Sequence, residues 1–172
     1  MNSLPFDALT FPLERIHLIE ASAGTGKTFS LASLYLRLLV ERELDVRDIL
    51  VMTYTRAATQ ELRERIRARI AVAAALAANL HTAVPGNVEE RFAMDVLNAR
   101  TRVEAPAALA ARLRDAAVRM DEATIATIHS FAQQAASENA FESALPFDRG
   151  TQVDDAAIIE AAVADYWRSQ VL

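Results

Sequence analysis

The chain has 172 residues, of which 52% are hydrophobic and 24% are charged, and its formal net charge is −5. This composition fits one globular domain with a substantial core and excludes a disordered chain, which would be less apolar and more highly charged. Cysteine is absent, which excludes disulfides and thiolate metal sites, and the negative charge argues against binding nucleic acid through bulk charge alone.

The sequence also argues against a histidine metal site, a membrane span and a signal peptide. His17, His81 and His129 lie far apart in the sequence and lack the spacing of metal ligands. No stretch approaches the roughly 20 apolar residues of a membrane span, and the N-terminus shows no basic start followed by an apolar run. We therefore expect a cytoplasmic protein.

Short strand patterns alternate with longer helical patterns along the chain. Strand candidates are apolar and rich in β-branched residues, and they occupy residues 16–20, 48–53 and 123–128. Helix candidates repeat apolar residues at spacings of three and four, and they occupy residues 28–42, 56–80, 88–100, 106–119 and 130–142, with a last helix from about 154. Strands separated by helices predict an α/β fold with a parallel sheet flanked by helices, interrupted by a helical insert at about residues 80–120.

A glycine-containing loop connects the first strand candidate to the first helix candidate. It follows the pattern G-x-x-x-x-G-K-[ST] of a phosphate-binding P-loop, except that alanine replaces the first glycine. The loop also holds the only lysine among the 18 basic residues of the chain. Its residues are Ala21, Ser22, Ala23, Gly24, Thr25, Gly26, Lys27 and Thr28.

Each invariant position of this pattern has a chemical task. Gly24 and Gly26 let the backbone approach a triphosphate closely, and the N–H groups at the helix start form an anion site. Lys27 is expected to reach the β- and γ-phosphates, and the Thr28 hydroxyl is expected to bind Mg²⁺. The alternative, a turn that merely caps a helix, fits the strand–loop–helix context less well. We therefore predict ATP and Mg²⁺ as cofactors, with Lys27 and Thr28 as the catalytic residues.

Two later segments make the prediction more specific. Residues 49–66 resemble motif Ia of superfamily 1 helicases of the UvrD type, and residues 127–131 resemble the motif that follows the third strand in that family. The loop variant at residues 20–29, together with residues 120–123 and 139–143, is most similar to the β subunits of exodeoxyribonuclease V. The resemblance extends from about residue 13 to 167.

The resemblance implies a RecA-like P-loop NTPase fold in an ATP-dependent DNA helicase and exonuclease that acts in double-strand break repair and recombination. Residues 1–142 would form part of ATP-binding domain 1A, and residues 143–172 would begin helical domain 1B. Single- and double-stranded DNA ends and the subunits RecC and RecD are the implied partners. The alternatives are an AddA-like subunit or a stand-alone UvrD-type helicase. A P-loop kinase or transporter ATPase would lack the two later motifs, and a non-catalytic module would not need an intact loop.

Five residues in the two later motifs are candidate DNA contacts. Hydroxyls and helix-start N–H groups at the carboxyl end of a strand can hold phosphates, and an aromatic ring offers a face for a base. The structural alternative makes the threonines strand-end or N-cap residues and the histidine a hydrogen-bonded core residue. The five residues are Thr53, Tyr54, Thr55, Thr127 and His129.

Other parts of an ATPase site are missing from the sequence. Asp121-Glu122 is the nearest candidate for the acidic motif that holds Mg²⁺, but it precedes a strand and follows a helical segment. No glutamine lies before Gln60, so the adenine-reading Q motif of many relatives is absent. We expect this chain to bind nucleotide without hydrolysing it. The arginines of residues 63–69 are interpreted as a solvated helix surface that pairs with Glu61 and Glu64, in preference to a DNA-binding stripe.

Overall fold

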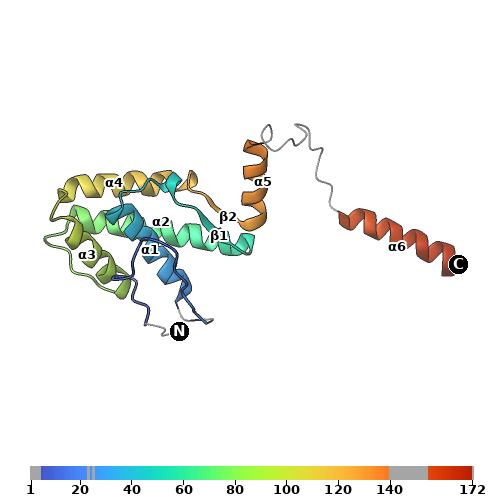
Figure 1. Cartoon of the computed structure of the whole chain (residues 1–172), viewed down its shortest axis with the longest axis horizontal. Helices are drawn as coiled ribbons and strands as arrows, with labels where there is room; N and C mark the ends of the chain where they lie inside the picture. The colour runs from blue at the N-terminus through green and yellow to red at the C-terminus, as the bar shows by residue number, and fades with distance from the viewer. Residues whose placement is uncertain (1–4, 23, 25, 140–154, 172) are drawn as a thin grey trace. The chain divides into compact units, whose positions relative to one another are not determined.

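The computed structural model describes residues 5–22, 24, 26–139 and 155–171, and the chain divides into two compact units, residues 1–131 and 132–172. Figure 1 shows the elements in chain order. They are α1 (Lys27–Glu41), the 3-10 helix η1 (Val46–Asp48), β1 (Val51–Thr53), α2 (Arg56–Ala78), α3 (Val88–Arg100), α4 (Pro106–Val118), the 3-10 helix η2 (Arg119–Asp121), β2 (Ile125–Thr127), α5 (Ile128–Glu138) and α6 (Asp155–Val171).

The sheet of the described residues consists of two parallel strands. β1 and β2 pair in the register Val51 with Ile125, Met52 with Ala126 and Thr53 with Thr127. The connection between them carries the α-helices α2, α3 and α4 and the 3-10 helix η2. The expected α/β arrangement with a helical insert between two parallel strands is therefore present, although the helices outweigh the sheet.

The central helix of the first unit is α2. It packs against α1, α3 and α4 and contacts both strands, and Figure 1 shows it running alongside α4. Its buried apolar residues recur at the helical spacing that the sequence predicted, and they meet apolar side chains from the neighbouring helices. Fully buried large side chains of this core include Leu36, Ile66, Ile70, Leu97, Leu109 and Leu113.

One face of the sheet is bare within the described residues. Leu50 and Met52 have exposed fractions of 43% and 52%, whereas Ile125 on the paired strand is buried. The sequence pattern of residues 48–53 is that of a parallel strand covered on both faces. The prediction was therefore wrong for one face: α2 covers the other.

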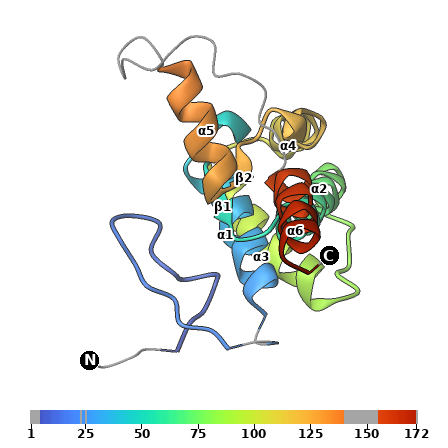
Figure 2. The same cartoon turned by 90° about the vertical axis from the view of Figure 1, so that its right-hand side faces the viewer.

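Residues 16–20 do not form the predicted strand. They have no regular secondary structure, and Ile16 and Leu18 are 99% and 84% exposed. Figure 2 shows the segment between the N-terminus and α1 looping away from the helices. A strand is stabilised by backbone hydrogen bonds to a neighbouring strand, and neither β1 nor β2 pairs with this segment. Alternating apolar residues alone therefore did not suffice to make a strand here.

The helix predictions were closer, with boundaries that move by a few residues. The helix predicted at 88–100 has these bounds, and the one predicted at 106–119 ends at Val118. The strand predicted from residue 48 starts at Val51, because Asp45 and Asp48 cap the short helix η1. The helix predicted at 130–142 is α5, which begins at Ile128 and ends at Glu138. The expected domain boundary at 142–143 lies outside the described residues.

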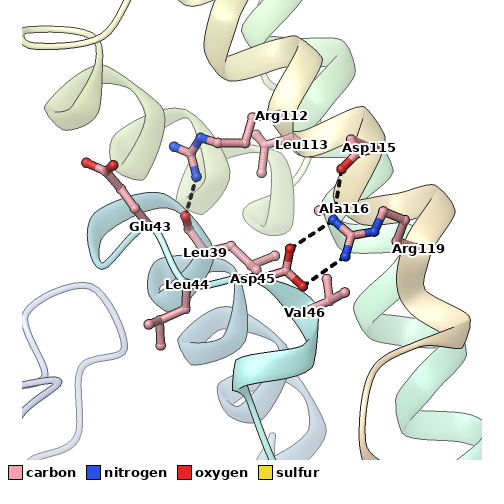
Figure 3. Close-up of a pocket in the computed structure, with 10 residues that line it drawn as sticks. All are labelled: Leu39, Glu43, Leu44, Asp45, Val46, Arg112, Leu113, Asp115, Ala116 and Arg119. Atoms are coloured by element: carbon pink, nitrogen blue, oxygen red, sulfur yellow. Dashed lines mark hydrogen bonds and ion pairs between the residues drawn. The ribbon is translucent and has the colours of Figure 1, made fainter.

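An ion-pair cluster ties α4 to the segment after α1. Arg119 donates to both carboxylate oxygens of Asp45, at 2.8 and 3.2 Å, and Arg112 donates to the Leu39 carbonyl at 2.5 Å. These side chains line a small hollow of about 110 Å³ (Figure 3). Because its polar groups satisfy one another, we interpret this hollow as a structural joint between helices.

The second unit contributes the helix α6, whose apolar side chains Ile159, Val163, Tyr166 and Trp167 are exposed. Among the described residues, no helix is long and apolar enough to cross a membrane.

Candidate functional site

The loop at residues 21–28 places two glycines in backbone conformations that other residues rarely adopt. Gly24 has φ 77° and Gly26 has φ 84°, and both values lie in the left-handed region that favours glycine. A Cβ atom added at Gly24 would meet no atom within 4 Å, so the space beside this glycine is open. Gly26 is the N-cap of α1, and the loop therefore leads directly into a helix N-terminus, where backbone N–H groups attract anions.

Lys27 and Thr28 are the first two residues of α1. The first backbone bond of the helix runs from the Ser30 N–H to the Gly26 carbonyl, at 2.9 Å. The N–H groups of residues 27–29 consequently have no helical carbonyl to pair with. The Lys27 side chain is exposed and the Thr28 side chain is half-buried, so a cation and a hydroxyl accompany the N–H groups at this terminus.

These residues fit a Mg²⁺-bound triphosphate. The open backbone at the glycines admits phosphate oxygens, the lysine supplies positive charge, and a threonine hydroxyl is the type of oxygen ligand that Mg²⁺ prefers. Ala21 and Ser22 are exposed, while Ala23 and Thr25 lie outside the described residues. No cluster of three or more His, Asp or Glu side chains able to hold a metal occurs in the part of the chain that the structure describes.

The second and third motifs meet at one edge of the sheet. Thr53 lies opposite Thr127 in the parallel register. Tyr54 and Thr55 follow Thr53, and His129 lies in the first turn of α5, two residues after Thr127. All five predicted DNA contacts therefore lie at the carboxyl ends of adjacent parallel strands, where open α/β sheets bind ligands.

The threonine hydroxyls at this edge have partners within the protein. Thr55 caps α2 by accepting a hydrogen bond from a backbone N–H of its first turn, at 3.1 Å. The Thr53 hydroxyl lies 2.6 Å from the Thr59 hydroxyl, and the buried Thr127 accepts from the Ser130 N–H at 3.2 Å. The capping role that sequence analysis kept as the alternative is thus present, and a contact with DNA would be additional to it.

Two rings at the same edge face solvent. The side chain of Tyr54 is 88% exposed, and His129 is also exposed. His129 is therefore not the buried core residue of the alternative interpretation. Because exposed rings can stack on bases, Tyr54 and His129 are better placed than the threonines to reach a ligand through their side chains.

Three arginines of α2 make contacts that the sequence did not predict. Arg65 forms the expected ion pair with Glu61, at 3.0 Å. Arg63, in contrast, donates to backbone carbonyls of residues 120, 123 and 125, which lead into β2, and Arg67 pairs with an aspartate of η2 at 2.6 Å. Arg69 is buried. The interpretation of residues 63–69 as a solvated surface was therefore correct for Arg65 and wrong for Arg63 and Arg69. Arg67 lies at the surface as expected, with a side chain 41% exposed, but its partner is Asp121 and not Glu61 or Glu64.

The acidic pair before β2 is engaged in ion pairs. Asp121 lies 2.6 Å from a nitrogen of Arg67, and Glu122 lies 2.9 Å from a nitrogen of Arg119. The hydrogen bonds from Arg119 hold the pKa of Glu122 below its usual value. Both acids therefore precede the strand and compensate the charge of arginines.

The family of the chain follows from comparison with known proteins. Residues 1–168 match the UvrD/REP helicase N-terminal domain, and the chain therefore belongs to the UvrD/REP helicase family. This match confirms the resemblance that the motifs indicated.

The relatives are subunits of one kind of enzyme. The chain is 41% identical to the RecBCD enzyme subunit RecB of Escherichia coli, over 94% of this chain and 14% of that protein. It is 37% identical to RecB of Haemophilus influenzae, over 97% of this chain and 14% of that protein, and 45% identical to RecB of Mycolicibacterium smegmatis, over 67% of this chain and 10% of that protein. The chain thus spans about a seventh or less of the length of these relatives.

Proposed function

We propose that the chain binds the phosphates of Mg²⁺-bound ATP at residues 21–28 and forms part of the motor of an ATP-dependent DNA helicase. The observation that supports this most directly is the pair of left-handed glycines, Gly24 and Gly26, which lead into a helix whose first residue is an exposed lysine. Bound ATP supplies a phosphoanhydride whose hydrolysis drives translocation. In this chain, Lys27 would neutralise phosphate charge and Thr28 would orient Mg²⁺.

Nucleotide titration tests the phosphate site. The Lys27→Ala substitution removes a charge-assisted contact, which is worth about 1.5–3 kcal/mol, and should weaken Mg²⁺-ATP binding at least tenfold in calorimetry. The matched control is Arg65→Ala, which removes an exposed cation on α2 and should leave the affinity unchanged. Equal affinity of the wild type and Lys27→Ala would exclude this site.

We propose that this chain is part of a longer protein whose other segments complete the ATPase site. We propose that it resembles RecB in function: a helicase and exonuclease subunit that processes DNA ends in double-strand break repair and recombination, with RecC and RecD as partners, in the cytoplasm. An AddA-like subunit or a stand-alone helicase is the alternative. Within this proposal, residues 1–142 belong to domain 1A and residues 143–172 begin domain 1B. The present chain, without the acidic motif, should show negligible ATPase activity, and Lys27-dependent turnover would contradict that expectation.

We further propose that the edge holding Thr53 and Thr127 binds single-stranded DNA. The parallel register brings two motifs together there, and Tyr54 is exposed beside them. Loss of one base–aromatic stack costs about 1–3 kcal/mol, so Tyr54→Ala should weaken oligonucleotide binding about tenfold in fluorescence anisotropy. His129→Ala should weaken it less, and Arg65→Ala serves as the control. Unchanged affinity in both ring variants would contradict the assignment.

A further inference from the structure

An open groove of about 470 Å³ begins at the end of the P-loop. Gly26 and Phe29 of α1 form one side, Phe6 of the N-terminal segment forms another, and α3 closes the third side. The residues of α3 that line the groove include Arg91, Phe92 and Asp95. Because Gly26 belongs both to the groove and to the loop, a ligand whose phosphates lie at residues 24–28 has this groove as the adjoining space.

The floor of the groove is fixed by packing. The ring of Phe29 meets that of Phe92 edge-on, with centroids 6.1 Å apart, and the guanidinium of Arg69 lies 4.4 Å from the Phe29 centroid. Arg69 is itself held by the Ser33 hydroxyl at 2.5 Å and by Glu89 of α3 at 2.9 Å. The insert helix α3 is therefore bound to the helix that carries the P-loop, through aromatic and ionic contacts.

The N-terminal side of the groove is also anchored. Arg37 of α1 donates to the carbonyls of Ala8 and Phe11, at 2.9 and 2.6 Å. Asp7 accepts hydrogen bonds from the Leu9 N–H and the Thr10 hydroxyl, which closes a turn beside Phe6. This wall of the groove is consequently held to the P-loop helix at two points.

Two charged side chains at the groove have no partner among the described residues. Arg91 and Asp95 lie one helical turn apart on α3, both are exposed, and neither side chain forms a hydrogen bond or ion pair within the described ranges. Hydrogen bonds from the Leu9 N–H and the Thr10 hydroxyl lower the pKa of Asp7. The groove is lined by the carboxylates of Asp7 and Asp95 and by the guanidinium of Arg91. Because negative side chains outnumber the positive one, the groove is unsuited to a phosphodiester. These side chains suit a ligand with an apolar planar body and N–H donors.

We propose that this groove receives the nucleoside end of the nucleotide, so that Arg91 and Asp95 of the insert helix recognise the base or ribose. The inference rests on the proposed phosphate site at residues 21–28. It assigns recognition of the nucleoside to a segment of the insert, in a chain that lacks a glutamine before Gln60. Aromatic and apolar walls with a few convergent polar groups are the usual make-up of small-ligand sites.

Calorimetric titration with two probes, Mg²⁺-ATP and Mg²⁺-tripolyphosphate, tests the inference. The wild type should bind ATP at least tenfold more tightly than tripolyphosphate, because only ATP carries the nucleoside. Asp95→Asn and Arg91→Gln should each weaken ATP binding about five- to tenfold and leave tripolyphosphate binding unchanged. Arg102→Gln, which changes an exposed arginine in the turn two residues after the end of α3, is the matched control. Since Arg91 and Asp95 are exposed and unpaired, the variants should keep the wild-type melting temperature.

The outcomes separate the two proposals. Equal binding of ATP and tripolyphosphate, with no effect of the α3 variants, would overturn the groove and leave the phosphate site intact. An equal loss for both probes in Asp95→Asn or Arg91→Gln would also overturn it, because the effect would then act through the loop. Failure of the wild type to bind either probe would overturn both proposals, and Lys27→Ala should weaken the binding of both at least tenfold.

Discussion

The guanidinium of Arg63 lies where carbonyl groups of another segment converge. It donates to the carbonyl of Met120 at 2.8 Å and to that of Ile125 at 3.0 Å, and so links α2 to the start of β2. Because Tyr54 and Thr55 precede α2 and His129 follows β2, this one side chain helps to hold the two proposed DNA motifs in place.

Removal of this side chain should destabilise the fold. Arg63→Ala leaves carbonyl oxygens without their donor, and we expect a loss of about 2–3 kcal/mol in the free energy of unfolding, measured by urea denaturation. Arg65 lies two residues after Arg63 on α2. Arg65→Ala breaks only an exposed ion pair and should cost under about 0.5 kcal/mol in the free energy of unfolding. Similar losses in the two variants would contradict a structural role for Arg63.

A second prediction at the residue scale concerns acid. Hydrogen bonds from the Arg47 N–H and from Arg119 lower the pKa of Asp45 to about 2, below the roughly 3.9 of an unfolded chain. The stabilisation is therefore complete above about pH 4 and is lost as the pH falls through about 2. Because Asp45 is partly exposed, we expect it to amount to about 1 kcal/mol.

Chemical denaturation between pH 2 and pH 6 measures this contribution. Asp45→Asn should be less stable than the wild type at pH 6, and the two should converge toward pH 2. The Asp165→Asn variant, which alters an exposed pair on α6, should follow the wild-type curve. A constant difference between wild type and Asp45→Asn across this range would refute the titration argument.

At the scale of an element, the N-terminus of α3 depends on a cap. The Asn87 side chain accepts from the Glu90 N–H at 2.9 Å, and the Glu90 carboxylate accepts from the Gly86 N–H at 2.7 Å. Asn87→Ala removes the cap and should lower the free energy of unfolding by about 1 kcal/mol, with Asn87→Asp restoring most of it. The same change within the helix, Asn98→Ala, should be neutral or slightly stabilising. Thermal denaturation of the wild type and the three variants measures these differences in stability.

This cap also explains why some elements could be predicted from sequence and others could not. The start of α3 is encoded locally, by Asn87 after Gly86, and its prediction was confirmed. Residues 16–20 have a strand pattern, but a strand also needs a neighbour to pair with, which the pattern does not reveal.

Side-chain reach is a further limit. Arg63 and Arg67 contact segments more than 50 positions away in sequence, which helical spacing alone cannot show. Their position beside the apolar stripe Leu62, Ile66 and Ile70 was the available indication. For the candidate site, the sequence was enough to propose the phosphate loop and the two segments predicted to contact DNA, whereas the groove beside α3 required the fold.

At the scale of the whole molecule, residues 14–18 form an exposed stretch of the first unit. Arg15 is exposed and has φ 68°, and its neighbour Ile16 is almost fully exposed. We expect trypsin to cleave after Arg15 and Lys27 before it cleaves after the buried Arg37 or Arg69, with fragments identified by mass spectrometry. Mg²⁺-ATP should slow cleavage at Lys27 and leave cleavage at Arg15 unchanged. Early cleavage within α2 would contradict this order.

Because Thr53 pairs with Thr127 in a fixed register, only some parts of the insert between the two strands can change in length without disturbing the sheet. The loops at residues 79–87 and 101–105 lie between helix ends, so added residues there can bulge outward without moving either strand. Residues 119–125 are clamped by Arg63 and Arg67 on their way into β2. A single deletion in this stretch would shift β2 by one position and turn its side chains to the opposite face. In evolution or in engineering, the insert can therefore gain or lose length at its turns, while its return path to the sheet is fixed residue by residue.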